Sequence, residues 1–281
     1  MLRYLVLCWL LFATTMAWAS KPLADWIATP DSMGLRYKSL TLTTPDHVRL
    51  AAWLIAPVAS APDQRTTMVV AGSDWGNMSY SLDQARALAA AGYQVLLFDY
   101  RGFGHSEAFA IDQHQLYYPE FAIDLGAALA EARRRSPRQR VGIIGFSMGT
   151  ILGAKVAATT RCDFLITDSY FANPQAVVAH YQKVRPERPV TLPADAATYV
   201  GVAPRVDCPW LFIAGTEDQA TPLADSLATA RAAHHGQRRE VLAVPCGHLG
   251  AIVKLTKQTF GDGYVQAVSR FLAGKSATAK G

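Results

Sequence analysis

Short apolar runs recur along this sequence and are separated by segments in which apolar residues return every third or fourth position. Residues 35–43 and 48–56 form two such runs joined by Thr44-Pro45-Asp46-His47, a proline-initiated turn. They predict an antiparallel strand pair at one edge of a sheet. Later runs predict strands at 67–71, 93–98, 140–144, 163–167, 210–214 and 240–244, with helices at 82–91, 121–134, 150–158, 223–233 and 251–272.

The alternation of strands and helices determines the expected fold class. Strands that are apolar throughout are buried on both faces, as in a mostly parallel sheet covered by helices on both faces. The chain has 281 residues, of which 51% are hydrophobic and 17% are charged, so it can build a large core. We therefore expect an α/β protein in which residues 20–281 form a single domain.

The first candidate for chemistry is the pentapeptide Gly145-Phe146-Ser147-Met148-Gly149, which lies between a predicted strand and a predicted helix. A serine at the apex of such a sharp turn has a strained backbone, and its hydroxyl stands clear of the sheet. The flanking glycines allow the strand to turn directly back into the helix. The pattern favours Ser147 as a nucleophile over a purely structural glycine-rich turn.

A serine nucleophile needs a base within hydrogen-bond reach, and the base needs an orienting carboxylate. Asp218 and His248 each follow a predicted strand, so they should lie with Ser147 at the carboxyl ends of the strands. Glu217 and Asp168 are competing carboxylates, and we favour Asp218. The other histidines lack this placement and are expected to be solvated or structural: His47, His105, His114, His180, His234 and His235.

Acyl transfer also needs donors for the oxyanion of the tetrahedral intermediate. The backbone N–H of Met148 is one candidate, because it directly follows the nucleophile. The second donor should come from the loop after the strand that ends at Ala71. We assign it to the backbone N–H of Ser73, with Asp74 as the alternative.

One stretch interrupts the alternation of strands and helices. Residues 170–205 contain five prolines, and Asn173-Pro174 has the pattern of a helix cap followed by proline at the first helical position. Short helices are expected at 176–184 and 194–200. Because a long interruption within an α/β core is commonly functional, we interpret this stretch as a short lid over Ser147. A packed surface insertion is the alternative.

These motifs resemble the α/β-hydrolase superfamily over residues 35–272. In addition, Asp99-Tyr100-Arg101-Gly102-Phe103-Gly104-His105-Ser106 is similar to the D-x-R-G-x-G-x-S segment of its prolyl-aminopeptidase-like and monoacylglycerol-lipase-like branch. The resemblance implies that this segment is a structural loop beside the site, without a catalytic role for Asp99 or Ser106. The sequence departs from the family before the oxyanion residue, where Ala71-Gly72 replaces the usual His-Gly.

The expected function is that of a serine hydrolase that cleaves carboxylic esters, or thioesters, with small or lipid-like acyl groups. A peptidase or aminopeptidase would use the same three residues, and Glu187 and Asp195 in the predicted lid are its candidate anchors for a free amine. An acyltransferase would also use them while excluding water. A noncatalytic ligand-binding protein on the same fold is the alternative from another class.

The first 19 residues have the features of a secretory signal peptide. Arg3 supplies the positive end, residues 4–16 contain a short apolar stretch, and Ala17-Trp18-Ala19 is an A-x-A cleavage site. An uncleaved membrane anchor is the alternative, although the apolar run is short for a spanning helix. We expect a secreted or periplasmic protein without stable membrane insertion after cleavage.

Charge and motifs favour a small-molecule substrate over a nucleic acid. Loss of Arg3 with the signal peptide lowers the formal net charge only from +5 to +4. The basic cluster at Arg133-Arg134-Arg135, Arg138 and Arg140 falls at the end of a predicted helix, where cations are favourable, and lacks interleaved aromatic residues. No motif for a metal or an organic cofactor is found, so neither is expected.

Cys162, Cys208 and Cys246 remain after the predicted cleavage. Cys162 and Cys208 each begin a strand-like run. If these strands are parallel neighbours, the two cysteines lie at the same end of the sheet and either form a disulfide or remain reduced. Cys246 is left free, two residues before His248, and we interpret it as a small apolar residue near the site.

Overall fold

The computed structural model describes residues 19–184, 186 and 189–277. The predicted signal peptide therefore lies outside the described residues except for Ala19, and so does Glu187. Ala19 and Ser20 are buried, and their backbone N–H groups donate to the carbonyl oxygen of Gln113. Among the described residues, no helix has the length and apolar character that a membrane span requires.

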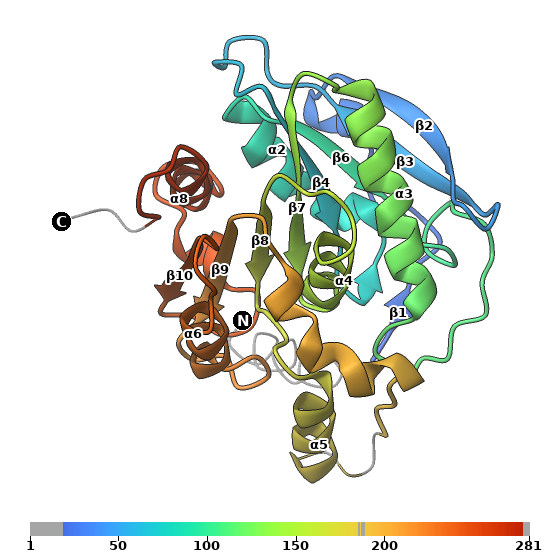
Figure 1. Cartoon of the computed structure of the whole chain (residues 1–281). Coiled ribbons are helices and arrows are strands. Elements are labelled where there is room, and N and C mark those ends of the chain that lie inside the picture. Colours follow the sequence, from blue (N-terminus) through green and yellow to red (C-terminus); the bar gives the residue numbers. More distant parts are fainter. Residues whose placement is uncertain (1–18, 185, 187–188, 278–281) are drawn as a thin grey trace, which may run out of the picture.

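An eight-stranded sheet runs through the centre of the molecule (Figure 1). Its strands follow the order β10-β9-β8-β7-β4-β6-β3-β2. In chain order they are β2 (Tyr37–Thr43), β3 (Arg49–Ile55), β4 (Thr66–Ala71), β6 (Gln94–Phe98), β7 (Arg140–Phe146), β8 (Leu165–Asp168), β9 (Trp210–Gly215) and β10 (Arg239–Val244). β3 pairs antiparallel with both β2 and β6, and all other neighbours are parallel. The predicted mostly parallel sheet with an antiparallel edge pair is confirmed.

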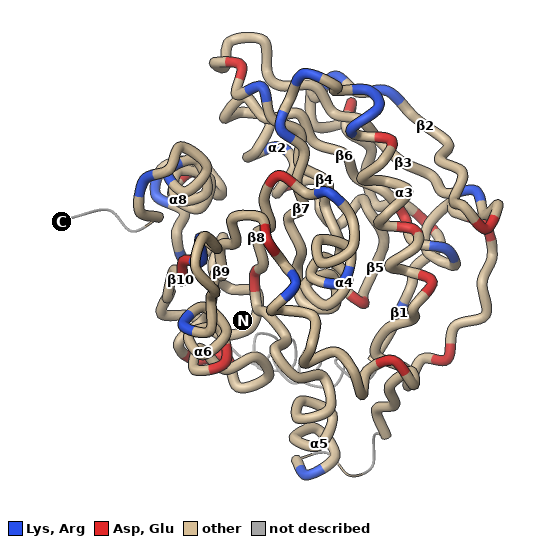
Figure 2. The backbone as a smooth tube through the Cα atoms, viewed as in Figure 1, with Lys and Arg blue, Asp and Glu red and all other residues tan. Residues whose placement is uncertain are grey.

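Helices cover both faces of the sheet, as predicted. They are α2 (Leu82–Ala90), α3 (Pro119–Arg135), α4 (Met148–Ala157), α6 (Leu223–Arg231), α7 (Ala251–Lys254) and α8 (Asp262–Leu272). Side chains of α3 and α4 join the apolar core on one face, and those of α2, α7 and α8 join the core on the other. Strands β4 and β9 are buried at every residue and, like β6, carry no charged side chain (Figure 2).

The C-terminal segment differs from the prediction of one helix over 251–272, because α7 and α8 are separate helices. The Asp262 carboxylate accepts hydrogen bonds from the backbone N–H groups of Gln258, Lys257 and Thr259. These bonds lower the pKa of Asp262 to about 2 and fold the chain into a turn before α8. The apolar periodicity continues across this turn, so it did not reveal the break.

The predicted insertion between β8 and β9 is present. It contains α5 (Pro174–Val184) and the short 3₁₀ helices η3 (Ala194–Gly201) and η4 (Ala203–Arg205). The predicted helix cap is confirmed, because the Asn173 side-chain oxygen accepts hydrogen bonds from the backbone N–H groups of Gln175 and Ala176. Helix α5 lies beyond one end of the sheet (Figure 1).

Apolar contacts and an ion pair attach this insertion to the rest of the chain. Val177 and Tyr199 are buried and belong to the core on the α3–α4 face. Lys155 of α4 pairs with Asp195 of η3, which also accepts a hydrogen bond from the Tyr117 hydroxyl. The insertion therefore packs against α4, the helix that follows Ser147.

The cysteines and the basic cluster have local roles in the structure. Cys162 and Cys208 precede the parallel neighbours β8 and β9, and both are free thiols, as is Cys246. Within the basic cluster, Arg133, Arg134 and Arg135 lie in the last turn of α3, where the helix dipole favours cations. Arg133 pairs with Asp163, and Arg134 and Arg135 pair with Glu131, so neighbouring carboxylates match these charges.

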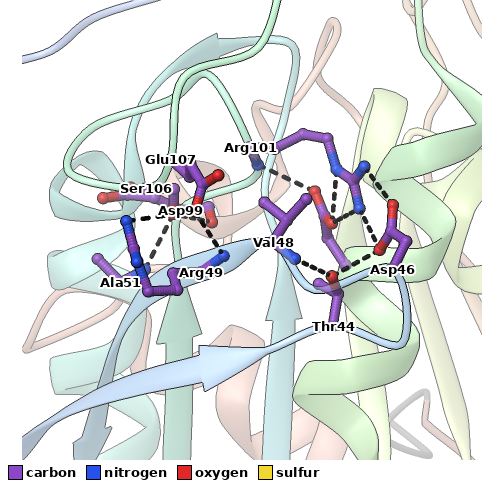
Figure 3. Close-up of polar contacts among 10 residues, drawn as sticks. Thr44, Asp46, Val48, Arg49, Ala51, Asp99, Arg101, Ser106 and Glu107 are labelled. Carbon is purple, nitrogen blue, oxygen red and sulfur yellow. Dashed lines mark hydrogen bonds and ion pairs between the residues drawn. The ribbon is translucent and has the colours of Figure 1, made fainter.

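A buried ion pair ties the edge strands to α3 (Figure 3). The Arg101 guanidinium donates to the Asp124 carboxylate through Nε at 2.9 Å and Nη2 at 2.7 Å, and through Nη1 to Asp46 at 2.7 Å. Asp124 is 0% exposed, and Asp46 lies in the turn between β2 and β3. One arginine therefore connects three segments that are distant in the sequence.

Replacement of Arg101 by methionine should destabilise the fold strongly, because it leaves the Asp124 carboxylate buried without its partner. Loss of one member of a buried pair typically costs about 3–5 kcal/mol. The matched control is Arg49→Met, which breaks an ion pair with Glu107 whose side chains are 72% and 41% exposed. That change should cost less than about 1 kcal/mol. Urea denaturation of both variants measures the difference, and equal losses would contradict this role of Arg101.

Candidate active site

Ser147 occupies a strained turn between β7 and α4. Its φ of 50° lies in the left-handed region that non-glycine residues rarely adopt. A side chain at Gly149 would overlap the carbonyl oxygens of Ala71 and Gly72, and one at Gly145 would overlap the backbone of Gly149. The turn is therefore as tight as the sequence predicts, and it packs directly against the end of β4.

The structure brings the three predicted side chains together at the carboxyl ends of the strands. Nε2 of His248 lies 2.9 Å from Oγ of Ser147, and Nδ1 of the same ring lies 2.8 Å from Oδ2 of Asp218. Asp218 follows β9 and His248 follows β10. The hydrogen bonds form an uninterrupted chain from the serine hydroxyl to the carboxylate.

Asp218 is held in its ionised form by its surroundings. Its Oδ1 accepts hydrogen bonds from the backbone N–H groups of Ala220 and Thr221, and its Oδ2 accepts one from the Thr221 hydroxyl. Although burial opposes ionisation, the hydrogen bond and charge of His248, together with the Thr221 contacts, lower the pKa of Asp218 to about 2. Glu217, its neighbour in the sequence, is exposed.

Ser169 is a site residue that the sequence analysis did not single out. Its hydroxyl accepts a hydrogen bond of 3.0 Å from the backbone N–H of Leu249, the residue after His248. The carbonyl oxygen of the preceding residue, Asp168, accepts a hydrogen bond of 3.1 Å from the backbone N–H of Ser147. The end of β8 is therefore bonded on one side to the nucleophile and on the other to the histidine loop. The available signal was its position, two residues after the predicted strand at 163–167.

One candidate oxyanion donor, Met148, belongs to the elbow, and the other, Ser73, belongs to the loop after β4. Among the hydrogen bonds of the described residues, none uses the backbone N–H of Met148 or of Ser73. Burial raises the pKa of the Asp74 carboxyl to about 6, although its own backbone N–H partly offsets this effect. Ser73 stays the predicted donor, with Asp74 as the alternative.

A cavity of about 190 Å³ adjoins these residues. Its lining includes Ser73 of the predicted oxyanion loop, Phe146 and Leu249, which precede Ser147 and follow His248 in the sequence, and also Phe103 and Ile252. Its remaining lining is Val70, Gly72, Trp75, Asn77, Met78, Tyr80, Ser81, Gln84, Leu97, Phe98, Asp99, Tyr100 and Asp168. The apolar side chains of the insertion, including Val177 and Tyr199, do not line it and pack into the core instead.

Asp99 and Ser106 have the structural role that the resemblance implies. The Asp99 carboxylate accepts hydrogen bonds from the backbone N–H groups of Met78 and His105 and from Nε1 of Trp26. The Ser106 hydroxyl donates to the carbonyl oxygen of Asp99 (Figure 3). Both residues therefore organise the loop beside the site.

Cys246 remains a poor candidate for a second nucleophile. Burial, and then the negative charges of Asp168 and Asp218, raise the pKa of its thiol. A raised pKa reduces the thiolate fraction, and the thiolate is the nucleophilic form. The sequence interpretation of Cys246 as a small residue near the site agrees with these surroundings.

Asp168, the competing carboxylate, is only 1% exposed, and within the described residues its Oδ2 accepts no hydrogen bond. Burial raises the pKa of Asp168 to about 7. An unfolded aspartate titrates near pH 4, at about 3.9. Between these two values the folded chain retains a proton that the unfolded chain has lost, so stability falls as pH rises through this interval.

The variant Asp168→Asn removes this titration and keeps Oδ1. We expect its free energy of unfolding to match that of the wild type at about pH 4 and to exceed it by about 2–4 kcal/mol at about pH 8. Urea denaturation at both pH values measures the difference. The control Asp83→Asn, at an exposed position on α2, should change stability little at either pH. A pH-independent effect at position 168 would contradict the assignment of a buried neutral acid.

Comparison with known proteins agrees with this geometry. The family model of the α/β hydrolase fold matches residues 68–177, which include β4, the Ser147 elbow and α4. An uncharacterized membrane protein of Saccharomyces cerevisiae is 25% identical over 203 residues, which cover 70% of this chain and 68% of the relative. Protein bem46 of Schizosaccharomyces pombe is 22% identical over 264 residues, which cover 88% and 80%.

Solved structures show the same fold. The esterase Pf2001 of Pyrococcus furiosus superposes with a TM-score of 0.71 at 20% identity, covering 91% of this chain and 99% of the esterase. An α/β serine hydrolase without a lid, XC6422 of Xanthomonas campestris, superposes with a TM-score of 0.54 at 18% identity, covering 85% and 93%. The matched family model, the sheet order and the similar solved structures together show that this chain has the α/β-hydrolase fold.

Proposed function

We propose that this chain is a serine hydrolase that cleaves carboxylic esters through an acyl-enzyme. The observation that carries the proposal is the hydrogen-bonded chain from the Ser147 hydroxyl through His248 to Asp218. A serine hydroxyl is a weak nucleophile at neutral pH, and an adjacent base is what activates it. The esterase and serine hydrolase among the similar structures add support by analogy.

The proposed acylation step uses the hydrogen-bonded groups of Ser147, His248 and Asp218 in turn. Oγ of Ser147 attacks the ester carbonyl carbon while its proton passes to Nε2 of His248. Asp218 accepts the hydrogen bond from Nδ1 of the ring, holds its orientation and stabilises the imidazolium that forms. Because its pKa is lowered to about 2, Asp218 remains ionised at neutral pH.

The negative oxygen of the tetrahedral intermediate needs hydrogen-bond donors that stabilise its charge. The backbone N–H groups of Met148 and Ser73 are the proposed donors, and loss of one such donor typically costs about 3 kcal/mol in the barrier. As the intermediate collapses, His248 donates its proton to the leaving alcohol. The same ring then takes a proton from water as the water oxygen attacks the acyl carbon, and it returns that proton to Oγ of Ser147 as the bond to the serine breaks and the acid leaves.

The cavity narrows the proposed substrate to esters with short acyl groups. Its volume of about 190 Å³ lies below the roughly 300–1,000 Å³ of pockets that enclose drug-sized ligands. Apolar side chains such as Val70, Leu97 and Ile252 line it, so a short alkyl group is the matching chemistry. A thioester presents the same carbonyl and falls within the proposal.

Ester hydrolysis is favoured over aminopeptidase activity by the state of Asp195. An aminopeptidase requires a carboxylate that is free to hold the substrate amine, but Asp195 is paired with Lys155 and with the Tyr117 hydroxyl. The other predicted anchor, Glu187, lies outside the described residues. An acyltransferase would use the same triad with an alcohol in place of water.

The proposed location is the periplasm or the extracellular medium. Its support is the sequence of residues 1–19, in which Arg3, an apolar stretch and the A-x-A site ending at Ala19 follow the order of a signal peptide.

The proposed lid is the insertion at 170–205, whose helix η3 packs on α4, the helix that follows Ser147.

A fluorophosphonate probe tests the nucleophile directly. The probe should label wild-type protein at Ser147 and leave Ser147→Ala unlabelled, with peptide mass spectrometry locating the adduct. Asp218→Asn should lower kcat for a chromogenic ester by about 10³–10⁴-fold, because the ring loses its orienting partner. The control Cys246→Ser should be labelled like the wild type. Labelling at another residue, or none, would overturn the proposed function.

Acyl-chain preference tests the substrate class. Nitrophenyl esters with two-carbon to twelve-carbon acyl chains differ only in the length that the cavity must accept. We expect kcat/KM to be highest for the short chains and at least about tenfold lower for the longest, because a long chain exceeds a cavity of about 190 Å³ and enters it only by displacing packed side chains. A steady rise in kcat/KM with chain length would exclude the short-acyl proposal.

A further inference from the structure

The residues that follow the predicted signal peptide form a strap, defined here as residues 20–27, that runs along the loop carrying Ser73. Strand β1 (Lys21–Pro22) pairs in parallel with strand β5 (Trp75–Gly76), a small sheet that the sequence analysis did not predict. The backbone N–H of Lys21 donates to the carbonyl oxygen of Asp74 at 2.7 Å, and that of Leu23 donates to Gly76 at 2.9 Å.

Side chains extend this attachment beyond the small sheet. Nδ2 of Asn77 donates to the carbonyl oxygens of Leu23 at 2.9 Å and Asp25 at 2.8 Å. Its Oδ1 accepts from the backbone N–H and the hydroxyl of Ser79, which fixes the orientation of the amide. The backbone N–H of Ile27 donates in turn to the Ser79 hydroxyl at 3.0 Å. Asn77 is buried, so these bonds are shielded from water.

The far end of the strap is held at the end of β6. Nε1 of Trp26 donates to the Asp99 carboxylate at 2.8 Å, and the same carboxylate accepts the backbone N–H of Met78 at 2.6 Å. The Trp26 ring stacks on His105 at 3.7 Å between centroids. Both the strap and the residue that follows the Ser73 loop are therefore bound to one buried carboxylate at the end of β6.

These contacts matter because an oxyanion donor works only when it is already in place. A backbone N–H that must be reoriented during the reaction loses most of its stabilising effect. In the segment 72–77, two glycines add backbone freedom, and Gly76 has a φ of 82°. Ser73 itself is anchored to the following residues by weak contacts of 3.4 Å between its hydroxyl and Trp75.

We propose that the strap is a positioning element that holds the Ser73 amide at the oxyanion site, through its hydrogen bonds to Asp74, Gly76 and Asn77. The proposal rests on the proposed function, because it assigns a role in the same acyl transfer. The family model begins at residue 68, so the strap is a feature of this chain outside the matched region. The predicted cleavage after Ala19 would leave the strap intact.

The sharpest test removes one backbone donor and compares the result with a variant that loses only the side chain. Lys21→Pro deletes the N–H that donates to Asp74, and proline suits the extended strand because Lys21 already precedes Pro22. Lys21→Ala removes the same side chain and keeps the N–H. We expect Lys21→Pro to lower kcat for a short-chain ester by about 10–100-fold, with KM changed less than about twofold, whereas Lys21→Ala retains wild-type kcat.

The affinity for a boronic acid is a measurement that a purely structural role of the strap would leave unchanged. The boronic acid forms a tetrahedral adduct with Ser147 that uses the oxyanion donors, so its affinity should fall in Lys21→Pro by the same factor as kcat. Asn77→Asp is the second variant: it keeps the acceptor for Ser79 and places oxygen against the carbonyls of Leu23 and Asp25. Its control is Gln237→Glu, which alters a similar amide bound to the carbonyls of Pro204 and Val206, on another part of the chain.

The outcomes separate the two proposals. If folded Lys21→Pro, with a thermal midpoint close to that of Lys21→Ala, has the same kcat and boronate affinity as its control, the strap proposal is overturned and the hydrolase proposal stands. If the wild type binds neither boronate nor fluorophosphonate at Ser147, the hydrolase proposal fails, and the strap proposal fails with it. A parallel loss of kcat and boronate affinity in both Lys21→Pro and Asn77→Asp supports the strap.

Discussion

The close approach of the Ser147 elbow to the end of β4 is the constraint from which the rest of the site follows. Ser147 has a φ of 50°, a conformation that costs about 1–3 kcal/mol for a non-glycine residue. It persists because β7 is buried along nearly its whole length and because Gly149 lies against the carbonyl oxygens of Ala71 and Gly72. The contact that strains the serine therefore also brings the next residue of that loop, Ser73, beside it.

The nucleophile and the histidine share a second anchor at the end of β8. The carbonyl oxygen of Asp168 binds the backbone N–H of Ser147, and the Ser169 hydroxyl binds the backbone N–H of Leu249. Ser169 and Leu249 also have positive φ, at 61° and 55°. Three strained non-glycine residues thus meet around one strand end, so the Ser147–His248 distance depends on a rigid strand more than on the loop at 245–250 that carries His248.

Much of this arrangement was predictable from sequence because it depends on local patterns. Wholly apolar runs identify the strands, and residues just after parallel strands must gather at one edge, which placed Ser147, Asp218 and His248 together. The strap at 20–27 and the anchor at Ser169 were not predictable in the same way. Their bonds join residues distant in sequence, and a short pair such as β1 and β5 has no apolar period to reveal it.

The choice between Asp168 and Asp218 shows most clearly what a linear pattern lacks. Both carboxylates lie at the carboxyl ends of neighbouring strands, and both are within electrostatic influence of His248. Asp218 is surrounded by donors from Thr221 and Ala220 that favour its charge, whereas burial favours the neutral form of Asp168. A neutral acid cannot stabilise an imidazolium by charge, so local donors, and not position along the sheet, distinguish the residue that orients the base.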